Sequence, residues 1–283
     1  MSTAPLQRVT MSGVSFGGII RSEWIKLRSL RSTVWCYAII VVLTLGVGAL
    51  IAFAMASGAT GGAGITGDAA TTMAVQTATF PISMTQLVAA VLGALVITGE
   101  YGTGMIRSTL TAVPKRLPAL VGKALVFALT TFLVSAVAIA VTGAMTLAML
   151  SGAGIGVEIT AGYLLALVGG AGYLALVGLL SFAIGAIIRS SAGGIAASLG
   201  LILVVPNVLP LLAFLTKADW IGEAAKYLPS NAGAQMYALA GSGAVDMFTG
   251  ATVLEPAIGL LVLVGWVVAL LALAAVLLKR RDA

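Results

Sequence analysis

The residues best suited to do chemistry lie in one polar, basic segment of a very apolar sequence. It begins GEYGTGMIRSTL, residues 99–110, and TAVPKRLPALVGK follows directly. The segment carries the carboxylate of Glu100 and the cations Arg107, Lys115, Arg116 and Lys123. It contains neither histidine nor cysteine. It can therefore offer hydrogen bonds, charge and a docking surface, but no imidazole or thiolate chemistry.

The sequence as a whole has few residues of the types that form catalytic sites or bind metal ions. It has no histidine and a single cysteine, Cys36, so imidazole-based triads, proton relays and metal sites are excluded. Cys36 cannot form an intramolecular disulfide, and we interpret it as a small apolar side chain at the start of a membrane span. Carboxylates are not clustered along the sequence. We therefore expect a non-catalytic protein without a bound metal.

Composition predicts a membrane protein. Hydrophobic residues make up 60% of the sequence and charged residues only 8%, whereas ordinary soluble domains are about 25% charged. Several apolar runs reach about 20 residues, which is enough to cross a hydrocarbon core of about 30 Å. These runs have no polar face at helical period. We predict an all-α integral membrane protein with a single transmembrane domain over residues 1–283.

Hydropathy predicts six transmembrane helices, at residues 34–56, 80–98, 119–149, 161–187, 192–215 and 256–278. Residues 57–72 are expected to form a flexible outer linker, because they are rich in Gly, Ala and Thr. Residues 217–231 are expected to form an amphipathic helix on the outer surface, stopped by Pro229.

A helix in the membrane–water interface is predicted before the first span, at residues 16–31. Its apolar face is formed by Phe16, Ile19, Ile20, Trp24, Leu27 and Leu30, and its polar residues include Arg21, Arg28 and Arg31. Glu23 interrupts the apolar face and is expected to pair with Lys26, three residues later. Membrane lipid is therefore one expected partner.

Thirteen of the fifteen Lys and Arg residues fall on one side of the predicted spans. They are Arg8, Arg21, Lys26, Arg28, Arg31, Arg107, Lys115, Arg116, Lys123, Arg189, Lys279, Arg280 and Arg281. Cytoplasmic loops are enriched in Lys and Arg, so both termini are expected in the cytoplasm, at the inner or plasma membrane of the cell. A cleaved signal peptide is not expected, because the charged N-terminal stretch precedes a full-length span. The net charge of +6 follows from this topology and needs no nucleic-acid partner.

Residues 100–111 predict a short helix just below the membrane. Glu100 and Thr103 suit its first turn, where side-chain oxygens accept hydrogen bonds from free backbone N–H groups. Pro114 marks its end. An exposed knob able to dock into another protein would be formed by residues at four-residue spacing, namely Tyr101, Met105 and Thr109. The alternative is a solvated loop that only maintains topology.

This segment resembles the connection between spans two and three of ABC-2-type transporter permeases. The shared pattern is a Glu ending span two, a Gly-Thr, an Arg, a Pro with a basic pair and a Lys opening span three. The matching residues are Glu100, Gly102, Thr103, Arg107, Pro114, Lys115, Arg116 and Lys123. RSEWIKLRSLRSTVW, residues 21–35, resembles that family's amphipathic entry segment.

The resemblance implies a six-helix ABC-2 (type V exporter-like) architecture and the role of permease subunit in a bacterial ABC exporter. A coupling helix between Glu100 and Arg116 would fit a cleft of a separate cytoplasmic ATPase, present in two copies. ATP and Mg²⁺ would be bound by that ATPase, because this sequence has no G-x-x-x-x-G-K-[ST] motif. A second permease protomer, identical or homologous, would pack through spans two and five. The exported substrate would be a hydrophobic or amphipathic drug, antibiotic, peptide or lipid-linked glycan.

Polar residues within two spans have competing interpretations. In span two, Ser83 and Gln86 lie on a stripe of small and polar residues that indicates helix packing, with Gln86 hydrogen-bonded across an interface. The same stripe could instead face the substrate. In span five, Pro206 and Pro210 predict a kink. Asn207 is expected to bond carbonyl groups left free there, and its alternative role is to line a polar pathway.

The alternative function is an ATP-independent secondary transporter or channel. Such proteins usually place an ionisable residue inside a span. Here Glu100 and Lys123 lie at the ends of spans, and no acidic residue falls in the middle of one. The sequence therefore favours the permease.

Overall fold

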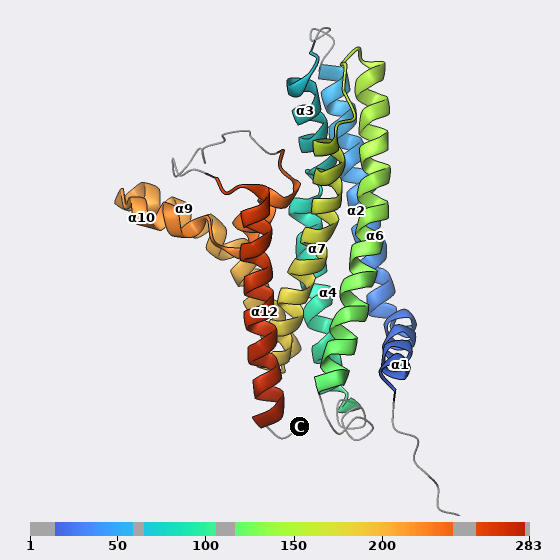
Figure 1. Cartoon of the computed structure of the whole chain (residues 1–283), viewed down its shortest axis with the longest axis vertical. Helices are drawn as coiled ribbons and strands as arrows, with labels where there is room; N and C mark the ends of the chain where they lie inside the picture. The colour runs from blue at the N-terminus through green and yellow to red at the C-terminus, as the bar shows by residue number, and fades with distance from the viewer. Residues whose placement is uncertain (1–14, 59–64, 106–116, 240–252, 281–283) are drawn as a thin grey trace, which may run out of the picture.

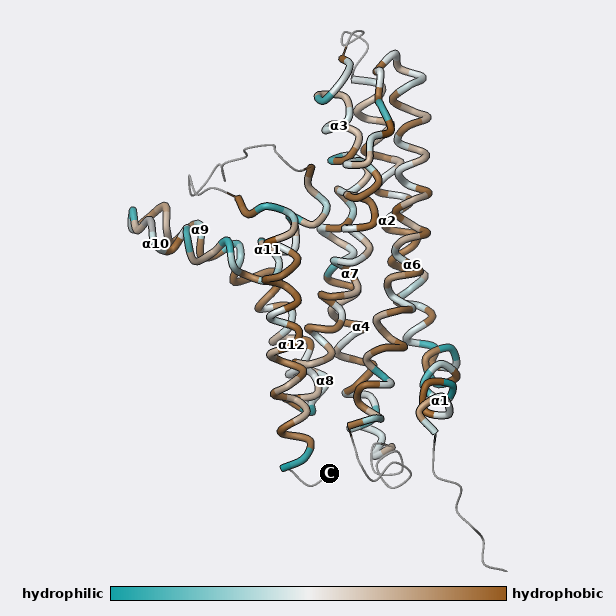
Figure 2. Tube along the Cα trace, viewed as in Figure 1, coloured by the Kyte–Doolittle hydropathy of each residue, from teal (hydrophilic) through white to brown (hydrophobic). Residues whose placement is uncertain are grey.

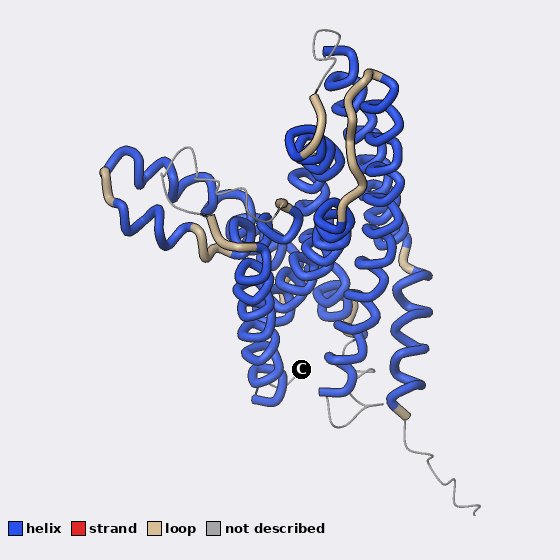
Figure 3. Tube along the Cα trace, turned by 45° about the horizontal axis from the view of Figure 1, so that its top comes forward, coloured by secondary structure: helices blue, strands red, loops and turns tan. Residues whose placement is uncertain are grey.

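The computed structural model describes residues 15–58, 65–105, 117–239 and 253–280. In these residues six helices are long and apolar enough to cross a membrane. They are Arg31–Gly58, Asp68–Gly102, Leu117–Gly152, Ala161–Ile188, Ser191–Thr216 and Pro256–Arg280. Figure 3 shows that helices account for nearly all of the described backbone. The prediction of an all-α chain with six apolar helices of membrane-spanning length is confirmed.

Most of the helices form an upright bundle (Figure 1). The first half of the chain contains α1 (Phe16–Ser29), α2 (Arg31–Gly58), α3 (Asp68–Thr79), α4 (Ile82–Gly102) and α6 (Leu117–Gly152). The second half contains α7 (Ala161–Ile188), α8 (Ser191–Leu199), α9 (Val205–Thr216), α10 (Asp219–Ala225), α11 (Pro229–Ala234) and α12 (Pro256–Arg280). A π-helical turn, Gly200–Val204, joins α8 to α9, and a 3-10 turn, Gln235–Tyr237, follows α11.

The centre of the bundle is α7, which packs against α4, α6 and α12. Its buried face includes Tyr173, Leu174, Val177 and Leu180, which belong to the largest apolar core of the described chain. Small residues let α4 and α7 approach closely. A Cβ atom on Gly93 would lie only 2.0 Å from the carbonyl oxygen of Gly178. Close packing of apolar helices through small residues is the usual arrangement in membranes.

The second apolar helix begins earlier than hydropathy predicts. Residues 68–79 form α3, whereas residues 57–72 were expected to be linker throughout. Thr and Ala lower the hydropathy of this stretch without preventing helix formation. Pro81 then interrupts the chain between α3 and α4, which is where the predicted span began.

The fifth apolar helix bends out of the bundle, and this confirms the predicted kink. After the π-helical turn, α9 runs sideways and is followed by α10 (Figures 1 and 3). Pro206 lies in the first turn of α9 and Pro210 within it, and each removes a backbone N–H. The Asn207 amide donates to the carbonyl of Leu203 at 2.6 Å, as its packing interpretation predicts.

The segment after α9 differs from the prediction. The helix expected to stop at Pro229 already ends at Ala225, and Pro229 instead opens α11. Proline is well tolerated at a first helical position, where its missing N–H has no intrahelical acceptor. The chain then returns to the bundle, because α11 packs against α12.

Polar residues gather toward the ends of the bundle (Figure 2). The described chain starts with α1 and finishes with α12 at the same end (Figure 1). This end, where α1 flanks the lower parts of α4 and α6, is named the α1 end below. It contains the buried charges Glu23, Glu100 and Lys123.

Candidate functional site: a buried ion network at the α1 end

Helix α1 brings two charged residues to the bundle. The Ser15 hydroxyl caps its first turn by accepting a hydrogen bond from the backbone N–H of Gly18 at 3.1 Å. Its buried face consists of Ile19, Glu23 and Leu27. Ile19 packs closely against Gly122 of α6, where an added Cβ would lie 2.8 Å from the Ile19 side chain. The face of α1 that packs against the rest of the bundle therefore carries a carboxylate, that of Glu23, in its centre.

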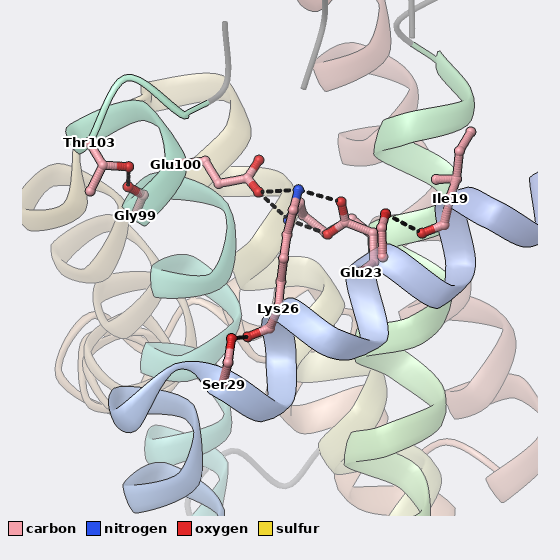
Figure 4. Close-up of polar contacts among 9 residues, drawn as sticks. Ile19, Glu23, Lys26, Ser29, Gly99, Glu100 and Thr103 are labelled. Atoms are coloured by element: carbon pink, nitrogen blue, oxygen red, sulfur yellow. Dashed lines mark hydrogen bonds and ion pairs between the residues drawn. The ribbon is translucent and has the colours of Figure 1, made fainter. Parts of the chain in front are cut away.

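Four side chains from three helices form an ion network, defined here by Glu23, Lys26, Glu100 and Lys123. The Lys26 ammonium donates to Glu23 Oε1 at 2.7 Å and to Glu100 Oε1 at 3.0 Å. The Lys123 ammonium donates to Glu23 Oε2 at 2.5 Å and to Glu100 Oε1 at 2.8 Å. In Figure 4 the two carboxylates approach Lys26 from opposite sides. The network confirms the expected Glu23–Lys26 pair and adds two partners to it.

The network is shielded from solvent. The side chains of Glu23 and Glu100 are each 4% exposed and that of Lys123 is 7% exposed, whereas Lys26 retains 27%. Burial alone lowers the pKa of Lys26, but hydrogen bonds and attraction from Glu23 and Glu100 outweigh it. The pKa of Lys26 is therefore raised above its usual 10.5, and the ammonium stays charged at neutral pH.

The prediction that a new helix starts at Glu100 is wrong. Glu100 lies in the last turn of α4, which continues to Gly102, and Thr103 follows as its C-terminal cap. The Thr103 hydroxyl donates back to the carbonyl of Gly99 at 2.8 Å instead of capping a new helix. The apolar helix persists because its final carboxylate finds two ammonium partners. Glu100 is thus buried inside the protein rather than exposed at a docking surface.

The other residues of the predicted coupling segment are only partly described. Tyr101 is half-buried and lies beneath the Arg189 guanidinium, 5.3 Å from the ring centre. Gly102 and Met105 are exposed. The remaining predicted residues lie outside the described part of the chain: Arg107, Thr109, Pro114, Lys115 and Arg116. The structure therefore places the start of this segment directly beside the ion network.

A helix forms within the predicted range 16–31, namely α1 at Phe16–Ser29, but its apolar residues point in different directions. Ile19 and Leu27 are buried against the bundle, whereas Phe16, Trp24 and Leu30 are exposed. Arg28 and Arg31 are exposed as well. The exposed residues of α1 thus include both apolar side chains and cations. A helix in the headgroup plane needs both, the apolar side chains for lipid and the cations for headgroups.

The polar residues of α4 serve packing. The Tyr173 hydroxyl of α7 donates to Gln86 Oε1, so Gln86 is hydrogen-bonded across a helix interface as predicted. The Gln86 amide donates in turn to the carbonyl of Ser83 at 3.0 Å. Ser83 itself is exposed and donates to the carbonyl of Phe80. The Tyr173–Gln86 bond satisfies polar groups between two apolar helices, whereas the two bonds of Ser83 and Gln86 to backbone carbonyls lie at the exposed surface.

Sequence reasoning missed the long-range half of the ion network. Glu23 and Lys123 stand 100 residues apart, and neither belongs to a recognisable motif together with the other. A usable signal was present nonetheless. Each is an isolated charge on an otherwise apolar helix face, and a buried charge of this kind requires a partner of opposite sign.

Comparison with known proteins adds no identification. The sequence matches no protein-family model and no curated protein. Within the described ranges, no group of three or more His, Cys, Asp or Glu side chains could hold a metal ion. The arrangement can do one thing: it locks α1, the end of α4 and the first turns of α6 together.

Proposed function

We propose that this chain is the membrane-spanning permease subunit of an ABC-2-type exporter, with both termini in the cytoplasm. Two copies of a separate ATPase would bind ATP and Mg²⁺ and act on the segment that follows α4. The substrate class that fits so apolar a chain is a hydrophobic or amphipathic molecule. The residue pattern around Glu100 and the six apolar helices support this proposal.

The observation that carries the proposal is the position of the ion network. Residues 106–116 connect α4 to α6, and Glu100 and Lys123 join these two helices close to both ends of that connection. Lys26 and Glu23 attach the same point to α1. A force applied to the connection by a partner would therefore move three helices as one unit rather than bend a loose loop.

The sideways arm, formed by α9, α10 and the turn that follows α10, supports the proposal of a second protomer. Leu211, Phe214 and Leu215 of α9 are all exposed, and α9 projects beyond the bundle. Two such chains, identical or homologous, would enclose a pathway that one bundle cannot. Closure of the ATPase pair would then favour one of two permease conformations, with the shift limited by the difference in affinity between them.

The alternative is an ATP-independent transporter or channel. In the described helices the buried charged residues are Glu23, Glu100 and Lys123, and all three lie at the α1 end. Ion-coupled transporters usually carry such a group near the middle of the membrane. The permease therefore accounts better for where the charges lie.

Co-purification tests the proposal. The tagged chain is expressed with its genomic neighbours, purified in mild detergent, and assayed for bound proteins and ATP hydrolysis. A variant with residues 106–116 replaced by a Gly/Ser linker should lose an ATPase that the wild-type chain retains. The control replaces residues 59–64 in the same way and should retain it. A stable wild-type chain that transports substrate without any ATPase would establish the alternative.

A further inference from the structure

A cavity of about 180 Å³ lies beside the ion network. Leu27, Leu95, Val96 and Val126 contribute apolar walls, and the network itself supplies charged lining through residues that include Glu100. The cavity lies where the apolar parts of α4 and α6 end and α1 begins to flank them. In a membrane this is the level at which lipid headgroups meet acyl chains.

Glu100, which lines the cavity, has one carboxylate oxygen without a donor. Glu100 Oε1 accepts from both ammonium groups, whereas Oε2 is buried and has no hydrogen-bond partner within the described structure. A buried acceptor without a donor is costly, and such an atom calls for an explanation. Because Oε2 is closed to solvent, a donor in the cavity can reach it only when the carboxylate rotates, and the terminal torsion of a Glu side chain has a shallow energy profile.

The charge of the site restricts what that donor can be. Two Glu and two Lys make the network neutral, so it does not select an anion. A suitable ligand would donate a hydrogen bond to Glu100 and carry a negative group for Lys26, the most exposed member. It would also need an apolar portion for the Leu and Val walls.

We propose that this cavity binds an aminophospholipid. Its primary ammonium donates to Glu100 Oε2, its phosphate lies near Lys26, and its apolar part covers Leu95 and Val126. A choline headgroup has the same charges but no N–H, so it cannot supply the missing hydrogen bond. This inference stands apart from the proposed function, because it requires neither an ATPase nor a second protomer.

Native mass spectrometry of the full-length chain tests the proposal without any transport assay. Phosphatidylethanolamine, phosphatidylcholine and phosphatidylglycerol with identical acyl chains are each added to the protein in mild detergent. Phosphatidylethanolamine should be retained about tenfold more than phosphatidylcholine, as expected for one charge-assisted hydrogen bond. Glu100→Gln should reduce this ratio toward one.

A cavity-filling variant keeps the test independent of the ion network. Gly99 lines the cavity, and a Cβ there meets no atom within 4 Å, so Gly99→Leu fills the space while leaving all four charges in place. Gly17→Leu is the matched control, because Gly17 on α1 is equally open and lies away from the cavity lining. Gly99→Leu should lose the bound lipid and Gly17→Leu should retain it.

Three outcomes would overturn the proposal. Equal retention of phosphatidylethanolamine and phosphatidylcholine would show that no N–H donor is recognised. Preferential retention of phosphatidylglycerol would show that lipid binds through its negative charge to cations on the protein surface. An unchanged lipid ratio in folded Gly99→Leu would place the lipid elsewhere on the protein.

Discussion

Lys123 of α6 donates a 2.8 Å hydrogen bond to Glu100 of α4 in a site that is almost closed to solvent. The two residues lie at the two ends of one connection, and each has a further partner on α1. Removing both charges of a buried pair can leave the stability nearly unchanged, whereas removing one leaves the other buried without a partner of opposite charge. The network is therefore most sensitive to single substitutions.

Lys123→Met should destabilise the protein by about 3–5 kcal/mol, because Glu23 and Glu100 would then share Lys26 alone. The free energy of unfolding can be measured by SDS titration in mixed micelles. Lys226→Met is the control, since Lys226 pairs with the exposed Glu223 on the arm, and its stability should be unchanged. Equal losses in both variants would contradict the role of the network.

Between neutral and alkaline pH, the contribution of Lys26 should change only in alkaline solution. The pKa of Lys26 is raised in the folded protein, so its stabilising effect is complete below about 10.5 and is lost as the pH rises through the folded value. The measurement is the difference in melting temperature between wild type and Lys26→Met as a function of pH. This difference should stay constant through neutral pH and shrink above 10.5. A difference that shrinks on acidification from pH 10 to 7 would contradict the assigned sign.

Gly93→Ala should weaken the central helix pair. The new methyl group would meet the Gly178 carbonyl oxygen at 2.0 Å, and relieving that clash should cost about 1–3 kcal/mol. Gly265→Ala on α12 adds the same methyl group where no atom lies within 4 Å. The control should be as stable as wild type or slightly more so, because Ala favours the helix. Thermal unfolding in detergent distinguishes the two, and similar melting temperatures would argue against tight α4–α7 packing.

Topology can be measured with single cysteines in a Cys36→Ser background. Ser29 at the end of α1 and Ser151 at the far end of α6 are both exposed. If the α1 end faces the cytoplasm, a membrane-impermeant maleimide should label Ser151→Cys in intact cells. Ser29→Cys should be labelled only after permeabilisation. The reverse pattern would overturn the predicted orientation and, with it, the proposed contact with a cytoplasmic ATPase.

Much of the fold could be predicted from the sequence, because a membrane imposes a minimum length on apolar helices. The expected span at 161–187 corresponds to Ala161–Ile188, and that at 256–278 to Pro256–Arg280. The kink near Pro206 also follows from local chemistry, since proline lacks the N–H that an inner helical turn needs. Helix α3 was missed because its Thr and Ala residues give a weak hydropathy signal.

The site was harder to predict than the spans. The Glu23–Lys26 pair follows from helical spacing, but the contacts to Glu100 and Lys123 depend on how distant helices pack. No spacing rule relates residues on three different helices. The continuation of α4 through Glu100 has the same origin, because only the tertiary partners make a buried carboxylate acceptable at that point.

The sequence separations within the ion network set the order in which it can form during synthesis. Glu23 and Lys26 leave the ribosome first, Glu100 follows more than 70 residues later, and Lys123 completes the set 100 residues after Glu23. Until α6 has been inserted, α1 has no complete set of partners and remains a surface helix of the nascent chain. A polypeptide truncated before Lys123 would keep two carboxylates with one ammonium between them. Completion of the network thus requires α1, α4 and α6 to have come together.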